Sequence, residues 1–188
     1  MDDSVQAALV KWPHVPDVYG WLRLDARGQW WIKNQPLNHA GMCAFFARNY
    51  QCDARGAWYV QNGAQRVFVD LDAAPYVAWC FDGVWQVEPG RQTITLRALY
   101  WCEDDALYLE FAPEHDVSVV RLAQVDDRIL ATVCAALAYA DGTVVTTLSY
   151  AELAVSGMAV WYTSAAVGIS LPVYPLCLSA LTFLRMPR

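Results

Sequence analysis

One stretch occurs twice in the chain and constrains its fold more than any other feature. Residues 25–34 (Asp-Ala-Arg-Gly-Gln-Trp-Trp-Ile-Lys-Asn) return 28 positions later as residues 53–62 (Asp-Ala-Arg-Gly-Ala-Trp-Tyr-Val-Gln-Asn). Asp favours the first position of a turn because its carboxylate accepts backbone N–H groups, and Gly tolerates a positive φ. The residues after Gly are aromatic or β-branched, as in strands. Each copy therefore predicts a tight turn that opens an aromatic strand.

The N-terminal part reads as strands interrupted by two helices. We predict a helix over 4–12 capped by Ser4, and a second over 39–51 capped by Asn38. In the second helix Met42, Phe45, Phe46 and Tyr50 form one stripe at helical spacing, which we expect to be buried; these four positions are the evidence for that helix.

Later residues read as short strands joined by tight connections. Asn62-Gly63 is a strong hairpin signal that leads into a strand over 65–71. The further strands are expected over 76–81, which would be covered on both faces, and over 93–101, 107–111, 117–123 and 143–148. Residues 82–87 resemble a third, degraded copy of the repeated turn. A helix is expected over 127–139, capped by Asp126, with a strand as the alternative for its second half. Because the connections are too short for parallel crossovers, we expect an antiparallel meander.

These elements predict an α+β fold of antiparallel sheets with one amphipathic helix in each half. The halves would be two related helix-and-sheet motifs that divide near residue 82, giving parts 1–82 and 83–188. The chain has 188 residues, which suits one domain or two small ones.

Composition excludes some classes of partner. The net charge is −6 and the sequence shows no basic cluster, so we expect no nucleic acid. Hydrophobic residues make up 56 % of the chain and charged ones 17 %, an excess that a core, a homo-oligomer interface or a membrane would bury.

The six cysteines show no Cys-x-x-Cys pair and no His at zinc-finger spacing, so we expect no metal and no cofactor. The acidic start without an apolar signal segment favours a cytoplasmic protein with reduced thiols.

Residues 153–184 carry no charge and are followed by Arg185 and Arg188. A run of this length can span a bilayer as an anchor. Ser, Thr, Gly and Pro interrupt it, so we expect instead a buried strand-and-helix segment.

Residues 20–82 resemble the first half of a proteobacterial family, domain of unknown function 1285. The matching residues are Gly28-Gln29-Trp30, Gln35-Pro36-Leu37, the helix around Phe45-Phe46, Gly56-Ala57-Trp58-Tyr59-Val60 and Asp72-Ala73-Ala74-Pro75-Tyr76. Asn34 replaces a glycine of the family pattern, and 62–66 depart from its Thr-Pro-Val-Glu-Lys segment. The resemblance implies an α+β fold of two related motifs and a role in signalling or ligand sensing, and it implies no catalytic residue.

Several residues are candidates for binding. Arg27 and Arg55 would project from the two turns and could bind an anion together, although each could instead pair with the Asp of its own turn. Trp31 and Tyr59 face away from Trp30 and Trp58, so the surface they form would be covered by the apolar tail, by a protein partner or by a small ligand.

Catalysis has one local candidate. His39 begins the second helix, and Cys43 lies one turn along the same face. His115 between Glu114 and Asp116, and the acidic run 103–105, are better explained as solvated loops. We therefore expect a non-enzymatic binding or signalling module; the alternatives are an enzyme using His39 and Cys43, and a membrane-associated protein anchored by 153–184.

Overall fold

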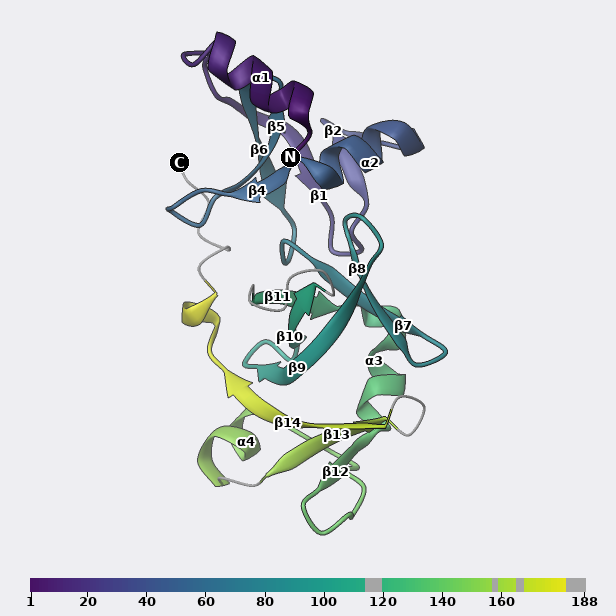
Figure 1. Cartoon of the computed structure of the whole chain (residues 1–188). Coiled ribbons are helices and arrows are strands. Elements are labelled where there is room, and N and C mark those ends of the chain that lie inside the picture. The colour runs from purple at the N-terminus through teal and green to yellow at the C-terminus, as the bar shows by residue number, and fades with distance from the viewer. Residues whose placement is uncertain (114–119, 157–158, 165–167, 182–188) are drawn as a thin grey trace. The chain divides into compact units, whose positions relative to one another are not determined.

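A computed structural model describes residues 1–113, 120–156, 159–164 and 168–181. The described chain divides into two compact units (Figure 1). The first consists of Met1–Pro75 with Glu88–Gly90, and the second of Tyr76–Val87 with residues 91–181. The division into domains near residue 82 stays a prediction.

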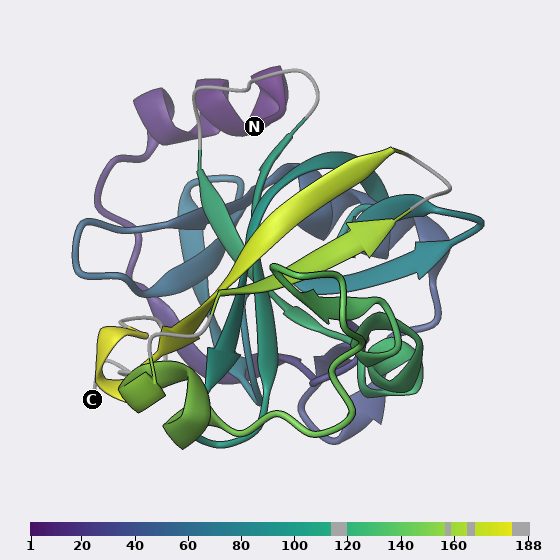
Figure 2. The ribbon, with the colours of Figure 1, turned by 90° about the horizontal axis from the view of Figure 1, so that it is seen from below.

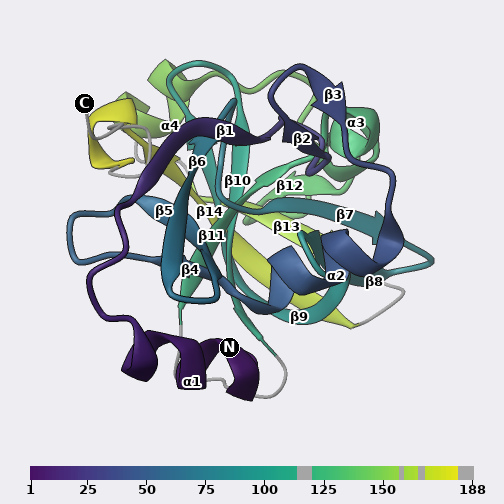
Figure 3. The same cartoon turned by 90° about the horizontal axis from the view of Figure 1, so that it is seen from above.

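The first unit is a sheet with two short helices, labelled in Figure 3. Its elements are α1 (Asp3–Lys11), β1 (Val18–Leu24), β2 (Trp30–Ile32), β3 (Gln35–Pro36), α2 (Ala40–Arg48), β4 (Tyr50–Cys52), β5 (Trp58–Asn62) and β6 (Gln65–Leu71). The strands lie in the order β3-β2-β1-β6-β5-β4. The hairpin predicted at Asn62-Gly63 is confirmed, with Asn62 opposite Gln65 and a φ of 59° at Gly63.

The two turns of the repeated stretch form as predicted, and both have the same pattern of backbone-to-carboxylate hydrogen bonds. Asp25 Oδ1 accepts the backbone N–H groups of Arg27 and Gln29, each at 2.9 Å. Asp53 Oδ1 accepts the corresponding groups of Arg55 and Ala57, also at 2.9 Å. Each turn joins two antiparallel strands, β1 to β2 and β4 to β5. The local carboxylate bonds explain why both turns need Asp at this position.

The second helix differs from its prediction at both ends. Its N-cap is His39 rather than Asn38, and it ends at Arg48, so Tyr50 belongs to β4. No residue of α2 is fully buried, and Met42 is 39 % exposed. Pairing of residues 50–52 with β5 ends the helix early, because a tertiary strand pairing outweighs helical periodicity.

The first helix matches its prediction within one residue, but Asp2 rather than Ser4 is its N-cap. The Asp2 carboxylate pairs with Arg48 and its backbone N–H donates to Asn49 Oδ1 at 2.9 Å. The hydrogen bond with Arg48 holds the pKa of Asp2 below its ordinary value. Val5 is buried, so α1 packs through one residue and is tied down by polar contacts.

The second unit contains a second sheet together with short helices. Its elements are β7 (Val77–Phe81), β8 (Val84–Glu88), β9 (Gln92–Cys102), β10 (Leu107–Pro113), β11 (Arg121–Val125), α3 (Asp127–Cys134), β12 (Leu137–Tyr139), α4 (Tyr150–Ser156), β13 (Val160–Ser164), β14 (Ile169–Leu176) and the 3₁₀ helix η1 (Leu178–Ala180). The order is β10-β11-β7-β8-β9-β14-β13-β12, and β10 also pairs with β9, which closes the first part of the sheet into a ring. Phe111, Leu99, Leu107 and Leu109 are fully buried.

The prediction of purely antiparallel sheets is wrong. Within the described residues β1 pairs with β6, β7 with β11, and β9 with β14, all in parallel. Most consecutive strands are joined by short connections, but each parallel partner arrives several elements later in the chain. The fold is therefore α+β with mixed sheets.

Three local predictions in this unit need correction. The helix begins after Asp126 as predicted but ends at Cys134, and residues 137–139 form β12. Residues 143–148 form no named strand; a single bridge joins Val144 to Ala138. The strand expected over 76–81 was predicted to be covered on both faces, but its last residue, Phe81, is 69 % exposed. The first part of the strand expected over 117–123 lies outside the described residues.

The apolar C-terminal run contributes strands to the second sheet. Its described residues form the end of α4, β13, β14 and η1, and Figure 2 shows β14, in yellow, beside β13. Val160 and Val173 lie opposite each other and are buried. Within the described ranges, no helix has both the length and the apolar character needed to cross a membrane.

A candidate ligand cavity beneath the second helix

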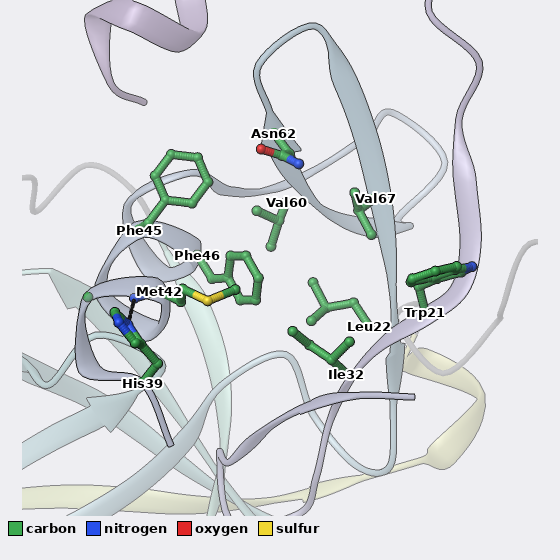
Figure 4. A pocket seen from close by; sticks show the side chains of 11 residues that line it. Trp21, Leu22, Ile32, His39, Met42, Phe45, Phe46, Val60, Asn62 and Val67 are labelled. Carbon is green, nitrogen blue, oxygen red and sulfur yellow. Dashed lines mark hydrogen bonds between the residues drawn. The ribbon is translucent and has the colours of Figure 1, made fainter. Parts of the chain in front are cut away.

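A cavity of about 420 Å³ lies between α2 and the sheet of the first unit (Figure 4). Its walls are almost entirely apolar. It is lined by Trp21, Leu22, Ile32, His39, Gly41, Met42, Phe45, Phe46, Val60, Asn62 and Val67.

The floor of the cavity follows from strand register. Leu22 lies opposite Ile32 across β1 and β2, and Val60 lies opposite Val67 across β5 and β6. Residues directly opposite in a ladder point to the same face of the sheet. Leu22 and Val60 are buried, so the floor is formed by well-packed aliphatic side chains.

The roof is the apolar stripe of α2. Met42, Phe45 and Phe46 lie three and four positions apart, which places them on one face of the helix. Phe46 meets the ring of Trp30 edge-on at 5.5 Å, and Trp30 meets Tyr50 edge-on at 5.4 Å. These contacts fix the C-terminal end of α2 on the sheet, while its N-terminal end stays exposed.

Trp21 closes the side of the cavity away from His39 (Figure 4). Consecutive residues of a regular strand point to opposite faces, yet Trp21 and Leu22 both line the cavity. The cause is a register shift in β1 between Val18 and Leu22, where Gly20 adopts a φ of 68°. Lys33 lies over the Trp21 ring, with its Nζ 4.0 Å from the ring centre.

His39 is at the exposed rim of the cavity and caps α2. Its Nδ1 accepts the backbone N–H of Met42 at 3.2 Å. A neutral imidazole that accepts through Nδ1 carries its hydrogen on Nε2. Gly41 makes room for this ring, since a Cβ at Gly41 would lie 3.2 Å from His39 Cε1. The cavity rim therefore holds a hydrogen-bond donor fixed by the helix start.

The other predicted site residues lie away from this cavity. Arg55 binds Asp53 through Nε and Nη2, both 3.0 Å from Oδ2, and its side chain is 65 % exposed. Burial raises the pKa of Asp53, but its hydrogen bonds with Ala57 and Arg55 outweigh this effect and lower it. Arg27 is exposed, and its backbone N–H donates to Asp25. The two arginines stand on different hairpins, one joining β1 to β2 and the other β4 to β5.

The side chains of Trp31 and Tyr59 both make hydrogen bonds and ring contacts with nearby residues of the first unit. Trp31 is half-buried; its Nε1 donates to Asp25 Oδ2 at 2.8 Å, and Arg23 lies over its ring at 4.5 Å. Tyr59 is 7 % exposed, and its hydroxyl donates to Gln51 Oε1 at 3.2 Å. Its ring centre is 5.7 Å from that of Phe68. Tyr59 thus belongs to the core of the first unit.

His39 and Cys43 have separate roles. The Cys43 thiol donates to Leu37 O at 3.4 Å, and burial raises its pKa, which disfavours the reactive thiolate. Cys43 is not among the cavity-lining residues. Within the described part of the chain, no three His, Cys, Asp or Glu side chains form a group suited to a metal ion. His115 lies outside the described residues.

Among the predicted site residues that the structure describes, His39 alone lines the cavity. Sequence reasoning missed the cavity itself, because the stripe on α2 was expected to be buried. One feature of the sequence could have indicated the cavity. Met42, the first residue of the stripe, follows Gly41 and lies close to His39 at the start of the helix. Such a start gives little apolar cover to its own first turn.

Comparisons place the chain among uncharacterised proteins. A family model named DUF2944, described as "Protein of unknown function (DUF2946)", matches residues 1–169. A DUF1285 family protein from Shewanella baltica OS155 is 16 % identical, with a TM-score of 0.43, over 60 % of this chain and 89 % of its own. Another, from Silicibacter pomeroyi DSS-3, is 16 % identical, with a TM-score of 0.41, over 68 % of this chain and 75 % of its own. The resemblance of residues 20–82 concerns the same DUF1285 family. Among curated proteins, none matches the chain.

Proposed function

Because the chain belongs to the DUF2944 family of unknown function, we propose its function from its own cavity: it is a non-enzymatic module that binds a small, mostly apolar molecule beneath α2. One observation carries the proposal. The apolar stripe of α2 leaves a space of about 420 Å³ between the helix and the sheet. Partner binding at Arg27, Arg55 and Trp31 stays a prediction.

The cavity has the character of a ligand site. Known sites have volumes of roughly 300–1,000 Å³, with apolar walls and few polar groups. Here the polar side chains of the wall are His39 and Asn62, both exposed. A ligand seated there would cover Met42, which is 39 % exposed, and removal of this apolar surface from water would favour binding.

The chemistry of the wall supports binding rather than catalysis. The His39 ring is used as a helix cap through Nδ1. The nearby Cys43 thiol has a raised pKa and donates to a backbone carbonyl. A nucleophile and base in contact would be needed for the alternative enzyme.

The test is a calorimetric titration of the full chain with three probes of equal chain length: decanol, decanoate and decylammonium. We expect saturable one-site binding of at least one probe. Met42→Trp fills the cavity and should weaken that binding by about tenfold or more. Ala44→Trp, on the exposed side of the same helix, is the matched control and should bind as the wild type does. Failure of all three probes to bind, or equal loss in both variants, would contradict the proposed function.

A further inference from the structure

We propose that the ligand is a small amphiphilic carboxylic acid, with its carboxylate bound at His39 and its apolar part in the cavity. This inference rests on the proposed function and specifies its ligand class. It follows from the uneven distribution of polar groups around the cavity and from the lack of acidic side chains among the described residues that line it.

The interior and the rim of the cavity differ in polarity. Leu22 is 3 % exposed and Val60 is fully buried, while His39, Met42 and Asn62 are exposed at the rim. A ligand with one polar end can bury its apolar part against the floor and leave its polar end in contact with water. This arrangement avoids the large penalty of burying a charge.

The donor at the rim selects an acceptor. Since Nδ1 of His39 accepts the Met42 N–H, Nε2 of the neutral ring carries a hydrogen and donates. The described residues that line the cavity include no Asp or Glu that would repel an anion. A hydrogen bond from this N–H to a carboxylate is charge-assisted and therefore stronger than one to a hydroxyl.

The start of α2 adds to this preference without carrying it. The first N–H groups of a helix have no partner within the helix, and the first turn of α2 contains no acidic residue. Gly41 lines the cavity and presents backbone without a side chain. An anionic group near His39 would be stabilised by the positive end of the helix dipole.

The opposite side of the cavity fixes the direction of the ligand. Figure 4 shows His39 and Trp21 on opposite sides, with Phe46, Leu22 and Ile32 between them. Lys33 lies over Trp21, but it is not a lining residue. Lys33 is therefore not in a position to bind a ligand inside the cavity, and the Trp21 ring gives the apolar part of the ligand a wall. The carboxylate is accordingly assigned to His39 rather than to Lys33.

The experiment compares decanoate, decanol and decylammonium in the full chain by calorimetry at neutral pH. We expect decanoate to bind about tenfold tighter than decanol, and decylammonium to bind weakest. His39→Ser keeps a capping oxygen and should abolish the preference for decanoate. His39→Asp also keeps the cap but introduces a negative charge, and should make decanoate bind more weakly than decanol. Lys33→Gln is the matched control and should keep the preference.

A second readout does not depend on variants. In the wild-type protein, decanoate should shift the Nε2 resonance of His39 in nitrogen-15 spectra, and decanol should leave it nearly unchanged. Decanol binding as tightly as decanoate, or a preference that survives His39→Ser in a folded protein, would overturn the carboxylate assignment while leaving the cavity as a binding site. Absence of binding by every probe would overturn the proposed function as well.

Discussion

The indole Nε1 of Trp31 donates to Oδ2 of Asp25 at 2.8 Å, whereas the equivalent oxygen of Asp53 accepts from Arg55. Oδ1 of each Asp accepts the same two backbone N–H groups of its own turn. The two turns therefore differ only in the partner of the other carboxylate oxygen, Oδ2. Tyr59 replaces Trp31 in the second copy, and its hydroxyl bonds to Gln51 instead. Asp25 therefore links its turn to the sheet surface, while Asp53 is bonded within its own turn.

Asp25→Ala removes the acceptor of three hydrogen bonds, two from the turn backbone and one from Trp31. We expect the free energy of unfolding to fall by about 1–3 kcal/mol, as for donors left without an acceptor. Urea denaturation followed by circular dichroism measures this change. Asp25→Asn keeps one carbonyl oxygen and should lie between the two proteins. An alanine variant as stable as the wild type would contradict the role given to this carboxylate.

Tyr59→Ala should act on stability before it acts on any partner. The side chain is 7 % exposed and packs on Phe68, so its truncation should lower the free energy of unfolding by about 3–5 kcal/mol. Tyr59→Phe loses only the bond to Gln51, which is worth about 1 kcal/mol. Thermal denaturation of both variants provides the comparison. Equal stability of Tyr59→Ala and Tyr59→Phe would show that the ring is not part of the core.

Asp126 should make the second unit sensitive to acid. Its carboxylate caps α3, accepting the Arg128 N–H at 2.9 Å, and pairs with the Arg128 side chain. The hydrogen bond with Arg128 outweighs burial and lowers the pKa of Asp126 below its ordinary value of 3.8. A lowered pKa in the folded state means that the charge stabilises the fold above the unfolded value, and that this contribution is lost as pH falls through the folded value.

The matching variant is Asp126→Asn, which keeps a capping oxygen without the charge. Its deficit in unfolding free energy should be constant above about pH 5 and shrink as the pH falls below about 4. Urea titrations across this range measure it. A deficit that does not change with pH would show that the charge of Asp126 has no stabilising role.

The cap geometry predicts the tautomer of His39. The wild-type ring should carry its hydrogen on Nε2, because Nδ1 accepts the Met42 N–H. Long-range proton–nitrogen spectra distinguish the two tautomers, and His39→Ser identifies the signal among the three histidines. Gly41→Ala places a Cβ 3.2 Å from the ring and should displace it, so that the cap weakens although alanine favours a helix by about 1 kcal/mol. A dominant Nδ1–H form in the wild type would contradict this geometry.

Local turn chemistry was readable from the sequence. Asp25, Asp53 and the Asn62-Gly63 pair each mark a hairpin that the structure contains. Asp126 marks the start of α3 for the same reason, because its carboxylate bonds within two residues. Such signals lie within a few residues of the structure they specify.

Long-range pairing left no comparable signal. β1 lies parallel to β6, with Leu22 opposite Val69, and nothing near Leu22 in sequence specifies that partner. The early end of α2 has the same origin, since Tyr50 satisfies a helical stripe equally well but is taken by β4. The cavity depends on both events, so the sequence predicted His39 as a candidate but not the space beside it.

The left-handed backbone at Gly20 means that a substitution at this position could alter the shape of the cavity. No atom lies within 4 Å of a Cβ built there, so a side chain would fit in space and meet only the strain of its φ of 68°. That strain is about 1–2 kcal/mol for most residues. Relaxing it would rotate Trp21 relative to Leu22 and reshape the cavity wall without replacing any lining side chain. A substitution at Gly20 would therefore change the shape of the proposed site from a position outside its wall.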